Sequence, residues 1–190
     1  MRIWAENWRP IEKRGGNAVL RMGLQMILCS SVLVLAGCVS PEDELAEGVS
    51  SARAAFEEEA PEPNEASGET ELYVPGGYEV EPASDDHHVL ITRGSQAFAL
   101  FLNPNEAPDS TFFYDLQKAN PEETWLADEK FSQHGRFGFV TVRTIAEDRY
   151  ELVVSSGSAK LSTITEQAAL RNQMEWMMKT ARSIEAAQEE

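Results

Sequence analysis

The sequence predicts an α+β domain in which a meandering antiparallel sheet of five to seven strands is covered by one long C-terminal helix. Two observations predict this class. Short runs rich in β-branched and aromatic residues follow one another from about residue 72 to residue 164, and Gly, Asn and Asp turns separate them. The last part of the chain then changes to a helical period without Gly or Pro. Most links between the runs are too short for parallel crossovers, which favours antiparallel pairing.

The predicted strands are the apolar or alternating runs between turn signals. Their ranges are 78–80, 88–93, 96–102, 125–133, 137–144, 149–155 and 159–164. Gly94-Ser95 is expected to join the second and third strands in a tight hairpin. One short helix is expected at Thr111–Ala119, with Phe112, Phe113 and Leu116 on one apolar face.

The C-terminal helix is the clearest element of the sequence. One apolar stripe steps along it by four and three residues: Leu170, Met174, Met177, Ala181 and Ile184. Thr163 and Glu166 have the spacing of a capping box at its start. Trp176 and Met178 flank the stripe, and together with its methionines they could form a soft binding groove. Packing in the core is the interpretation that helical spacing favours.

The first part of the chain contains an apolar run with a distinctive end. Leu24–Ala36 is about thirteen residues long, whereas a membrane span needs about twenty. Basic residues precede the run, and Leu35-Ala36-Gly37-Cys38 closes it. This tetrapeptide resembles the lipobox of bacterial lipoproteins, and the resemblance covers residues 21–38. It implies cleavage between Gly37 and Cys38, and lipidation of Cys38.

The resemblance makes residues 1–37 a lipoprotein signal peptide and the protein a lipid-anchored component of the extracytoplasmic side of the cell membrane. In a Gram-negative cell, Val39 after the cysteine implies the outer membrane. The leader is long for such a signal. Either it is a real leader, or the purine-rich codons of Lys13–Gly16 mark a ribosome-binding site and translation starts at Val19 or Leu20.

Residues 38–71 are predicted to be the lipidated cysteine followed by a disordered acidic tether. The segment after Cys38 carries eleven acidic residues and a single aromatic one, so little apolar surface can offset the entropy of ordering. A transient helix at about residues 42–59 is the alternative, and it would also act as a spacer. The globular domain is therefore expected to span residues 72–190.

Charge and cysteine content narrow the classes of function. The formal net charge is -16, and removal of the basic leader leaves about -19. So acidic a surface repels nucleic acid, and no nucleic-acid partner is expected. Cys29 would leave with the signal and Cys38 would carry lipid, so the mature chain would have no disulfide and no thiolate for a metal or for catalysis. No cofactor is expected.

Three histidines are weak candidates for a metal site. His87 and His88 follow two aspartates at the start of a predicted strand, and His134 lies in a predicted turn. Adjacent residues on a strand point to opposite faces, so His87 and His88 cannot easily share one ion. The interpretation favoured here is a polar turn, and no metal site is predicted.

Other polar and aromatic residues also allow both a functional and a structural interpretation. Arg136, Arg143 and Arg149 could bind an acidic ligand, but pairing with neighbouring glutamates such as Glu147 and Glu151 is the favoured interpretation.

The Gly135–Phe139 run could be a ligand platform, although core packing is favoured, with Gly138 allowing either a close approach by the helix or a bulge. Near the last predicted hairpin the sequence has Ser155, Ser156, Ser158 and Lys160. These residues could suggest a catalytic serine–lysine pair, but the favoured interpretation is a polar turn.

Motifs of nucleotide-binding, metallopeptidase and serine hydrolase families are absent from the sequence. The function predicted from the sequence is a non-enzymatic binding or interaction module of the cell envelope, with an envelope protein, peptide or polymer as partner. The alternatives are a structural component of an envelope assembly and, less favoured, a small metal-binding protein or enzyme.

Overall fold

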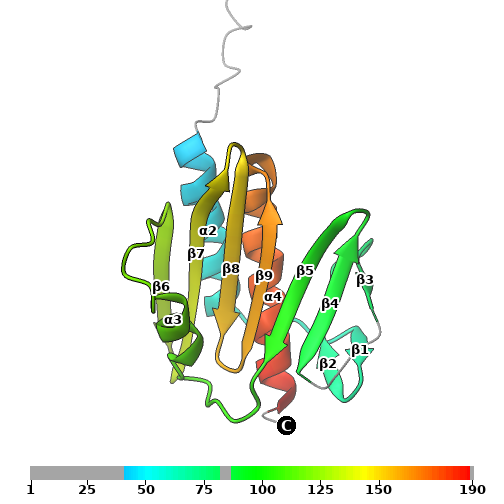
Figure 1. The fold of residues 1–190 in the computed structure, drawn as a ribbon. Helices are drawn as coiled ribbons and strands as arrows, with labels where there is room; N and C mark the ends of the chain where they lie inside the picture. Colours follow the sequence, from blue (N-terminus) through cyan, green and yellow to red (C-terminus); the bar gives the residue numbers. More distant parts are fainter. Residues whose placement is uncertain (1–40, 82–86, 189–190) are drawn as a thin grey trace, which may run out of the picture. The chain divides into compact units, whose positions relative to one another are not determined.

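The computed structural model describes residues 41–81 and 87–188, and side chains of the last helix as far as Ile184. These residues belong to one compact unit (Figure 1). The expected signal peptide and the tetrapeptide with Gly37 and Cys38 lie outside the described residues. The unit is an α+β domain, as the sequence predicts.

The helices are α2 (Pro41–Glu57), α3 (Phe112–Gln117) and α4 (Leu170–Gln188), and the 3-10 turn η1 (Gln167–Ala169) leads into α4. A two-stranded hairpin is made by β1 (Glu65–Ser67) and β2 (Thr70–Leu72). The strands of the main sheet are β3 (Glu79–Val80), β4 (His88–Arg93), β5 (Gln96–Leu102), β6 (Ala127–Gln133), β7 (Arg136–Ala146), β8 (Arg149–Ser156) and β9 (Ala159–Thr165).

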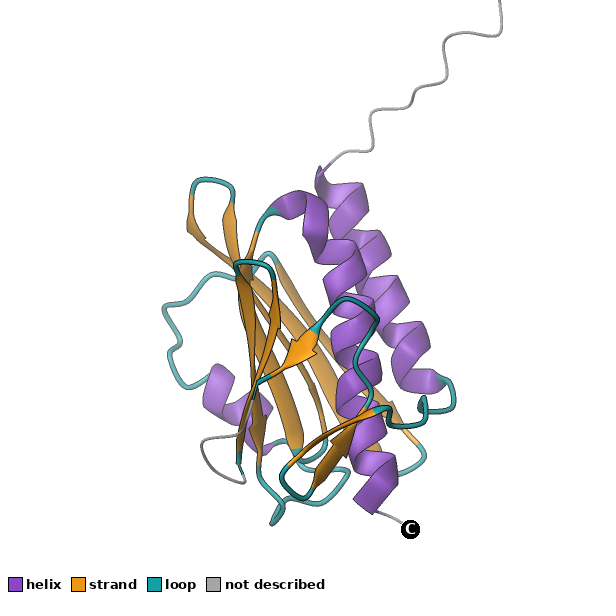
Figure 2. Ribbon diagram, turned by 90° about the vertical axis from the view of Figure 1, so that its right-hand side faces the viewer, coloured by secondary structure: helices purple, strands orange, loops and turns teal. Residues whose placement is uncertain are grey.

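The main sheet has seven antiparallel strands in the order β3-β4-β5-β9-β8-β7-β6. It consists of two meanders, and the pairing of β5 with β9 joins them. Because β9 takes the place beside β5, the chain leaves β5 through a long connection that carries α3 and reaches β6 at the far edge (Figure 1). The two long helices cover one face of the sheet, and α3 lies on the opposite face (Figure 2).

The prediction of a disordered tether over residues 38–71 is wrong for the described part of that segment. Pro41–Glu57 forms α2, which packs against α4 and the sheet, and Ala52, Ala55 and Phe56 are at most 2% exposed. The β1–β2 hairpin follows it. The domain therefore includes residues from Pro41 onward, not only those from residue 72.

The prediction failed because composition is an average over all residues of the segment, whereas a helix packs when the residues of one face are apolar. The apolar residues of α2 are Leu45, Val49, Ala52 and Phe56, and they recur at steps of four, three and four, so they share one side of the helix. The acidic residues occupy the other side and lower the mean hydropathy. The alternative prediction of a helix at about residues 42–59 is confirmed. Its expected role as a spacer is wrong, because α2 packs into the core of the domain.

Two glycines let α2 approach its neighbours closely. A Cβ atom on Gly48 would lie 2.7 Å from the Met174 sulfur of α4. A Cβ atom on Gly138 of β7 would lie 2.8 Å from a ring carbon of Phe56 and 2.8 Å from the Ser155 carbonyl oxygen. The expected close approach at Gly138 is therefore real, but the helix that approaches is α2 and not the C-terminal helix.

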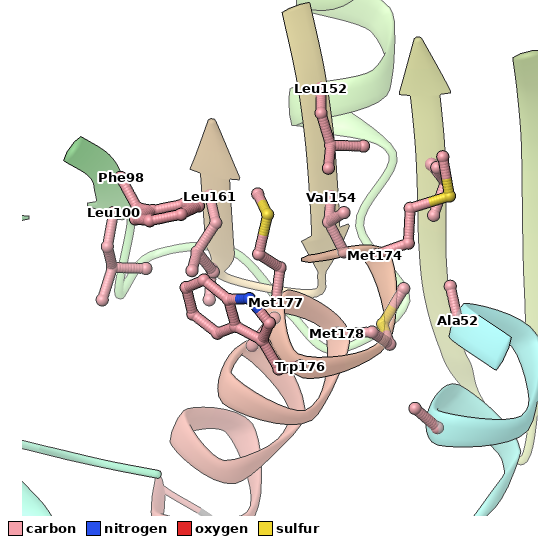
Figure 3. Close-up of a cluster of buried hydrophobic side chains, with 14 of the residues drawn as sticks. Ala52, Phe98, Leu100, Leu152, Val154, Leu161, Met174, Trp176, Met177 and Met178 are labelled. Carbon is pink, nitrogen blue, oxygen red and sulfur yellow. The ribbon is translucent and has the colours of Figure 1, made fainter. Parts of the chain in front are cut away.

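The predicted core role of the methionines and Trp176 is confirmed (Figure 3). Trp176 stacks edge-to-face on Phe98 of β5, with ring centroids 4.8 Å apart, and Tyr78 lies against the same indole at 4.6 Å. Fully burying one such side chain contributes roughly 1.5–3 kcal/mol. The principal core therefore lies between the sheet and the two long helices.

Two local expectations are wrong. Thr163 belongs to β9 and its hydroxyl donates to the Ala97 carbonyl oxygen at 2.8 Å, while Glu166 makes no side-chain cap, so no capping box forms. On α3 only Phe113 is buried, whereas Phe112 is 44% exposed and Leu116 is 56% exposed. A helix of two turns presents too narrow a face to bury all three residues against the sheet.

We expect Gly138→Ala to lower the free energy of unfolding by about 1–3 kcal/mol, because the new methyl group would overlap the Phe56 ring and a strand carbonyl. Gly76→Ala is the matched control, since nothing lies within 4 Å of its Cβ position. Urea denaturation measures both. In a Phe56→Leu background the cost of Gly138→Ala should shrink, because one of the two contacts is removed. An unchanged cost in that background would contradict the packing of α2 against β7.

Candidate functional site

The two faces of the main sheet differ in how completely they are covered. The face that carries most of the principal core lies beneath α2 and α4, whereas the opposite face, here called the open face, is covered only in part by α3 (Figures 1 and 2). Beneath α3, Phe113, Phe139 and Val153 form a second small core. No helix of residues 41–81 and 87–188 lies on the remainder of the open face, over β4, β5, β9 and part of β8.

The strand register sets out the open face in rows that run across the strands. The first row, in the order of the strands, is His88, Phe101, Lys160, Ser155, Phe139 and Lys130. The second row is Leu90, Ala99, Ser162, Val153, Thr141 and Asp128. In the second row, β5 and β9 therefore carry only small side chains, Ala99 and Ser162. Larger side chains flank them, with Phe101 and Lys160 in the first row and Leu90 on β4.

A groove of about 630 Å³ lies in the uncovered part of the open face. We call it the open groove. Ala97, Ala99 and Ser162 contribute small side chains to its lining, and Leu90 and Ile164, which are 42% and 49% exposed, also line it. Its shape therefore follows from sequence, because small residues leave the backbone of β5 and β9 accessible between two larger apolar ones.

Exposed apolar side chains are distributed unequally over the described surface. The large hydrophobic residues that are exposed there are Leu90, Phe112, Leu116, Leu126, Ile145 and Ile164. None of them belongs to α2 or α4. Leu90 and Ile164 line the open groove, and Phe112 and Leu116 lie on α3, which packs on the same side of the sheet. Two of the six exposed residues therefore lie in one groove.

An ion-pair network borders the open groove. Arg143 of β7 bonds to Glu151 of β8 at 2.5 Å and to Glu123 at 3.1 Å. The hydrogen bond with Glu151 raises the pKa of Arg143 above its ordinary value. The favoured interpretation of Arg143 as a structural ion-pair partner is thus confirmed, and Glu151 is held at the edge of the groove.

Lys160 has a different environment from Arg143. It is partly buried in the first row, and its ammonium lies over the rings of Phe101 at 4.8 Å and Phe113 at 5.3 Å. Desolvation lowers the pKa of Lys160, and the nearby Glu151 offsets this only in part. The aromatic rings therefore hold a cation at the boundary between the second core and the uncovered part of the face.

The three histidines do not come together. His88 stacks on Phe101 at the start of β4, with centroids 4.8 Å apart, and His134 lies in the β6–β7 turn with φ of 52°. Four strand steps separate β4 from β7, which corresponds to roughly 20 Å. The described residues contain no group of three or more potential ligands arranged around a metal ion.

The other two arginines have separate surroundings. Arg136 follows the β6–β7 turn and lines a cavity at the end of α2, whereas Arg149 begins β8 and lines the open groove. The three arginines considered in the sequence therefore do not form one cluster.

The serine–lysine interpretation is also not supported by the geometry. The Ser155 hydroxyl donates to the Ala159 carbonyl oxygen at 2.8 Å, and the neighbouring Lys160 ammonium lies over the aromatic rings. Phe137 and Phe139 share the open face, as expected, and they pack with Tyr114 of α3 as core.

A larger cavity, of about 930 Å³, lies near the end of α2 and the β6–β7 turn. Its lining includes six carboxylates: Glu57, Glu58, Glu59, Glu62, Glu65 and Glu71. His134, Arg136 and Arg182 face the same space. Its polar lining and acidic rim resemble a solvated surface hollow, so the open groove is the stronger candidate despite its smaller volume.

Sequence reasoning did not identify Leu90, Ala99, Ser162 or Ile164 as site residues. One signal was present: Val89, Leu90 and Ile91 form a continuous apolar run, and a strand that is apolar on both faces is expected to be covered on both faces. Here the face that carries Leu90 has no cover from the described part of the chain.

No family model matches the chain, and no curated protein matches it in sequence. None of the helices in residues 41–81 and 87–188 combines the length and apolar character needed to cross a bilayer. The features that point to a function are therefore the geometry of the open face and the sequence motif at Cys38.

We expect the stability difference between Lys160→Met and wild type to depend on pH. Because the pKa of Lys160 is lower in the folded state than its usual 10.5, the unfolded state binds more protons in the window just below 10.5. The free energy of unfolding of the wild type should therefore gain on that of the variant as the pH rises toward 10.5. Urea midpoints at pH 7, 8.5 and 10 measure this, and a gap that stays constant or moves the other way contradicts it.

Proposed function

We propose that the protein is an extracytoplasmic lipoprotein, anchored through Cys38, whose domain is a non-catalytic module that binds a partner of the cell envelope on its open face. The observation that carries the proposal is the open groove with its exposed Leu90 and Ile164. Exposing such side chains to water is unfavourable, at roughly 25 cal/mol per Å² of apolar area, and a bound partner would remove that cost.

The engagement of the polar groups on this face supports a binding role over catalysis. Arg143 is neutralised by Glu151 and Glu123, and Ser155 bonds to a backbone carbonyl. General acid–base or nucleophilic chemistry needs a nucleophile and a base within hydrogen-bond reach of each other, and these contacts use the groups for other purposes.

The position of α2 changes what the proposed anchor implies. With α2 beginning at Pro41, only Val39 and Ser40 separate it from Cys38. Two to three residues span at most roughly 10 Å. A lipidated Cys38 would therefore hold the domain at the membrane surface instead of on a long tether, and its partner would have to reach the same layer.

Cys38→Ala should abolish incorporation of radiolabelled palmitate and leave an unprocessed precursor, because the thiol is the expected site of lipid attachment. The matched control is Cys29→Ala, which removes the other cysteine and should leave labelling unchanged. Gel mobility and labelling in cells measure both. Labelling that persists in Cys38→Ala would contradict the anchor.

The binding role is tested by a photo-crosslinking amino acid placed at Ala99 in the open groove and, as a control, at Arg171 on the exposed side of α4. A discrete crosslinked species is expected from position 99 and not from position 171. The absence of any position-specific product at 99 in cells would contradict a binding module that uses this face.

A further inference from the structure

The short helix α3 has two flanks with different surroundings. On one flank, the Tyr114 hydroxyl donates to the Asp128 carboxylate of β6 at 3.1 Å, and Lys118 bonds to the same carboxylate at 2.8 Å. Phe112 and Leu116 are each two residues from Tyr114, which is about 200° of helical turn, so they share the opposite flank. We call it the apolar flank. Because β6 is an edge strand, the apolar flank faces inward, toward the part of the open face that α3 leaves uncovered.

The open face therefore has a raised half and a hollow half. α3 forms the raised half, where it packs on β7 and β8, and the open groove occupies the hollow half. Both halves expose large apolar side chains, Phe112 and Leu116 on the apolar flank and Leu90 and Ile164 in the groove. A surface with one raised and one hollow half is complementary to a copy of itself that is turned about a two-fold axis.

A two-fold axis parallel to the strands meets this requirement. It would set the apolar flanks of the two α3 helices against each other and place each α3 over the open groove of the other copy. α2 runs alongside the strands and begins at one end of the sheet (Figure 1). The same axis therefore keeps both copies of Pro41 at one end of the dimer. Both copies could then be anchored through Cys38 in one membrane, and this confinement would raise their effective concentration.

The charges of the open groove are compatible with a second copy. The chain has a net charge of -16, so two copies repel each other unless the contact surface is close to neutral. The charged residues of the groove lining are Arg149, Glu151 and Glu166, and Glu151 is already bonded to Arg143. One charge of each sign is left in the lining. The cavity at the end of α2 has six carboxylates instead, so of these two surfaces the open face repels a second copy less.

The open face is also large enough for a stable dimer. The six strands from β4 to β9, about 4.8 Å apart and about seven residues long, give a face of roughly 30 Å by 24 Å, or about 700 Å². A contact over the whole face would bury about 1,400 Å² from the two copies together, and stable specific interfaces bury about 1,200–2,000 Å². The hollow half alone would give only about half of this area, which favours a contact that uses both halves.

We propose that the open face binds a second copy of this chain. In the two-fold symmetric dimer the α3 helices lie side by side through Phe112 and Leu116, and each α3 covers the groove of the other copy with its Leu90 and Ile164. The proposal rests on the proposed role of the open face as a binding surface and names its partner. One contact then shields the exposed apolar residues of both halves from water.

Oxidative crosslinking of the purified full-length protein in mild detergent tests the position of the axis, with copper phenanthroline as the oxidant. In a Cys29→Ala background, Leu116→Cys places a thiol on the apolar flank, where its counterpart in the second copy should lie within disulfide distance. Arg171→Cys is the matched control, because Leu116 is 56% exposed and the Arg171 side chain on α4 is 55% exposed. We expect at least tenfold more disulfide-linked dimer from Leu116→Cys. Equal yields from the two variants, or no dimer from either, would overturn the proposal.

Charged substitutions at the same position distinguish a second copy from another partner. Leu116→Glu and Leu116→Lys should each weaken the dimer at least tenfold, because like charges would meet across the axis. An equimolar mixture of these two variants should restore the dimer, because opposite charges would then meet. Arg171→Glu makes α4 more acidic and should leave the dimer unchanged. Sedimentation equilibrium in density-matched detergent measures the protein mass. A monomeric wild type, or a mixture that stays monomeric, would overturn the proposal.

The outcome is distinguishable from a failure of the proposed function. A product crosslinked at position 99 in cells whose mass differs from that of a dimer, together with a monomeric purified protein, would keep the binding role and refute self-association. A monomeric protein that also gives no product at position 99 would refute the two together.

Discussion

Seven strands about 4.8 Å apart make a sheet roughly 30 Å wide, whereas a helix with its side chains is only about 10–12 Å across. One helix cannot cover such a face. α4 packs over the middle of the sheet, through residues such as Met174 and Met177, and α2 fills the space beside it over β6 and β7. Phe56 reaches Gly138 and Phe131 from α2, with the second pair of ring centroids 5.6 Å apart. Without α2, this part of the core would face water.

The elements that the sequence predicted correctly are those specified by local signals. The ranges 88–93 and 96–102 agree with β4 and β5, because alternation and a glycine turn are properties of neighbouring residues. The apolar stripe of α4 is likewise a pattern among residues that are close in sequence. The pairing of β5 with β9 was not predictable in this way, since it depends on which edges remain free once both meanders have formed. The helix α2 was only the alternative to a disordered tether, and its packing into the domain was not predicted, because acidic residues dominate its composition, although Leu45, Val49, Ala52 and Phe56 carry the helical period.

The candidate site was less accessible to sequence reasoning than the fold. Charged and catalytic residue types attract attention in a sequence, but Arg143 is used in a structural ion-pair network and Ser155 in a backbone hydrogen bond. The groove instead comes from alanine and serine on β5 and β9, which are informative only when the register places them side by side. Ala99 and Ser162 are directly opposite each other. Their importance follows because no helix of the described residues covers this part of the sheet, and this is a property of the whole topology.

The extent of α3 explains why the face stays open. This helix has six residues, and its buried Phe113 covers Phe139 and Val153 on the β7–β8 side of the sheet. It leaves Leu90 and Ile164 exposed, at 42% and 49%. Threonine or lysine at those positions would have made the uncovered strands compatible with water, as exposed sheet faces commonly are. Neither residue type occupies those two positions. Exposed apolar side chains are unfavourable for an isolated domain, and a partner that covers Leu90 and Ile164 would remove that cost.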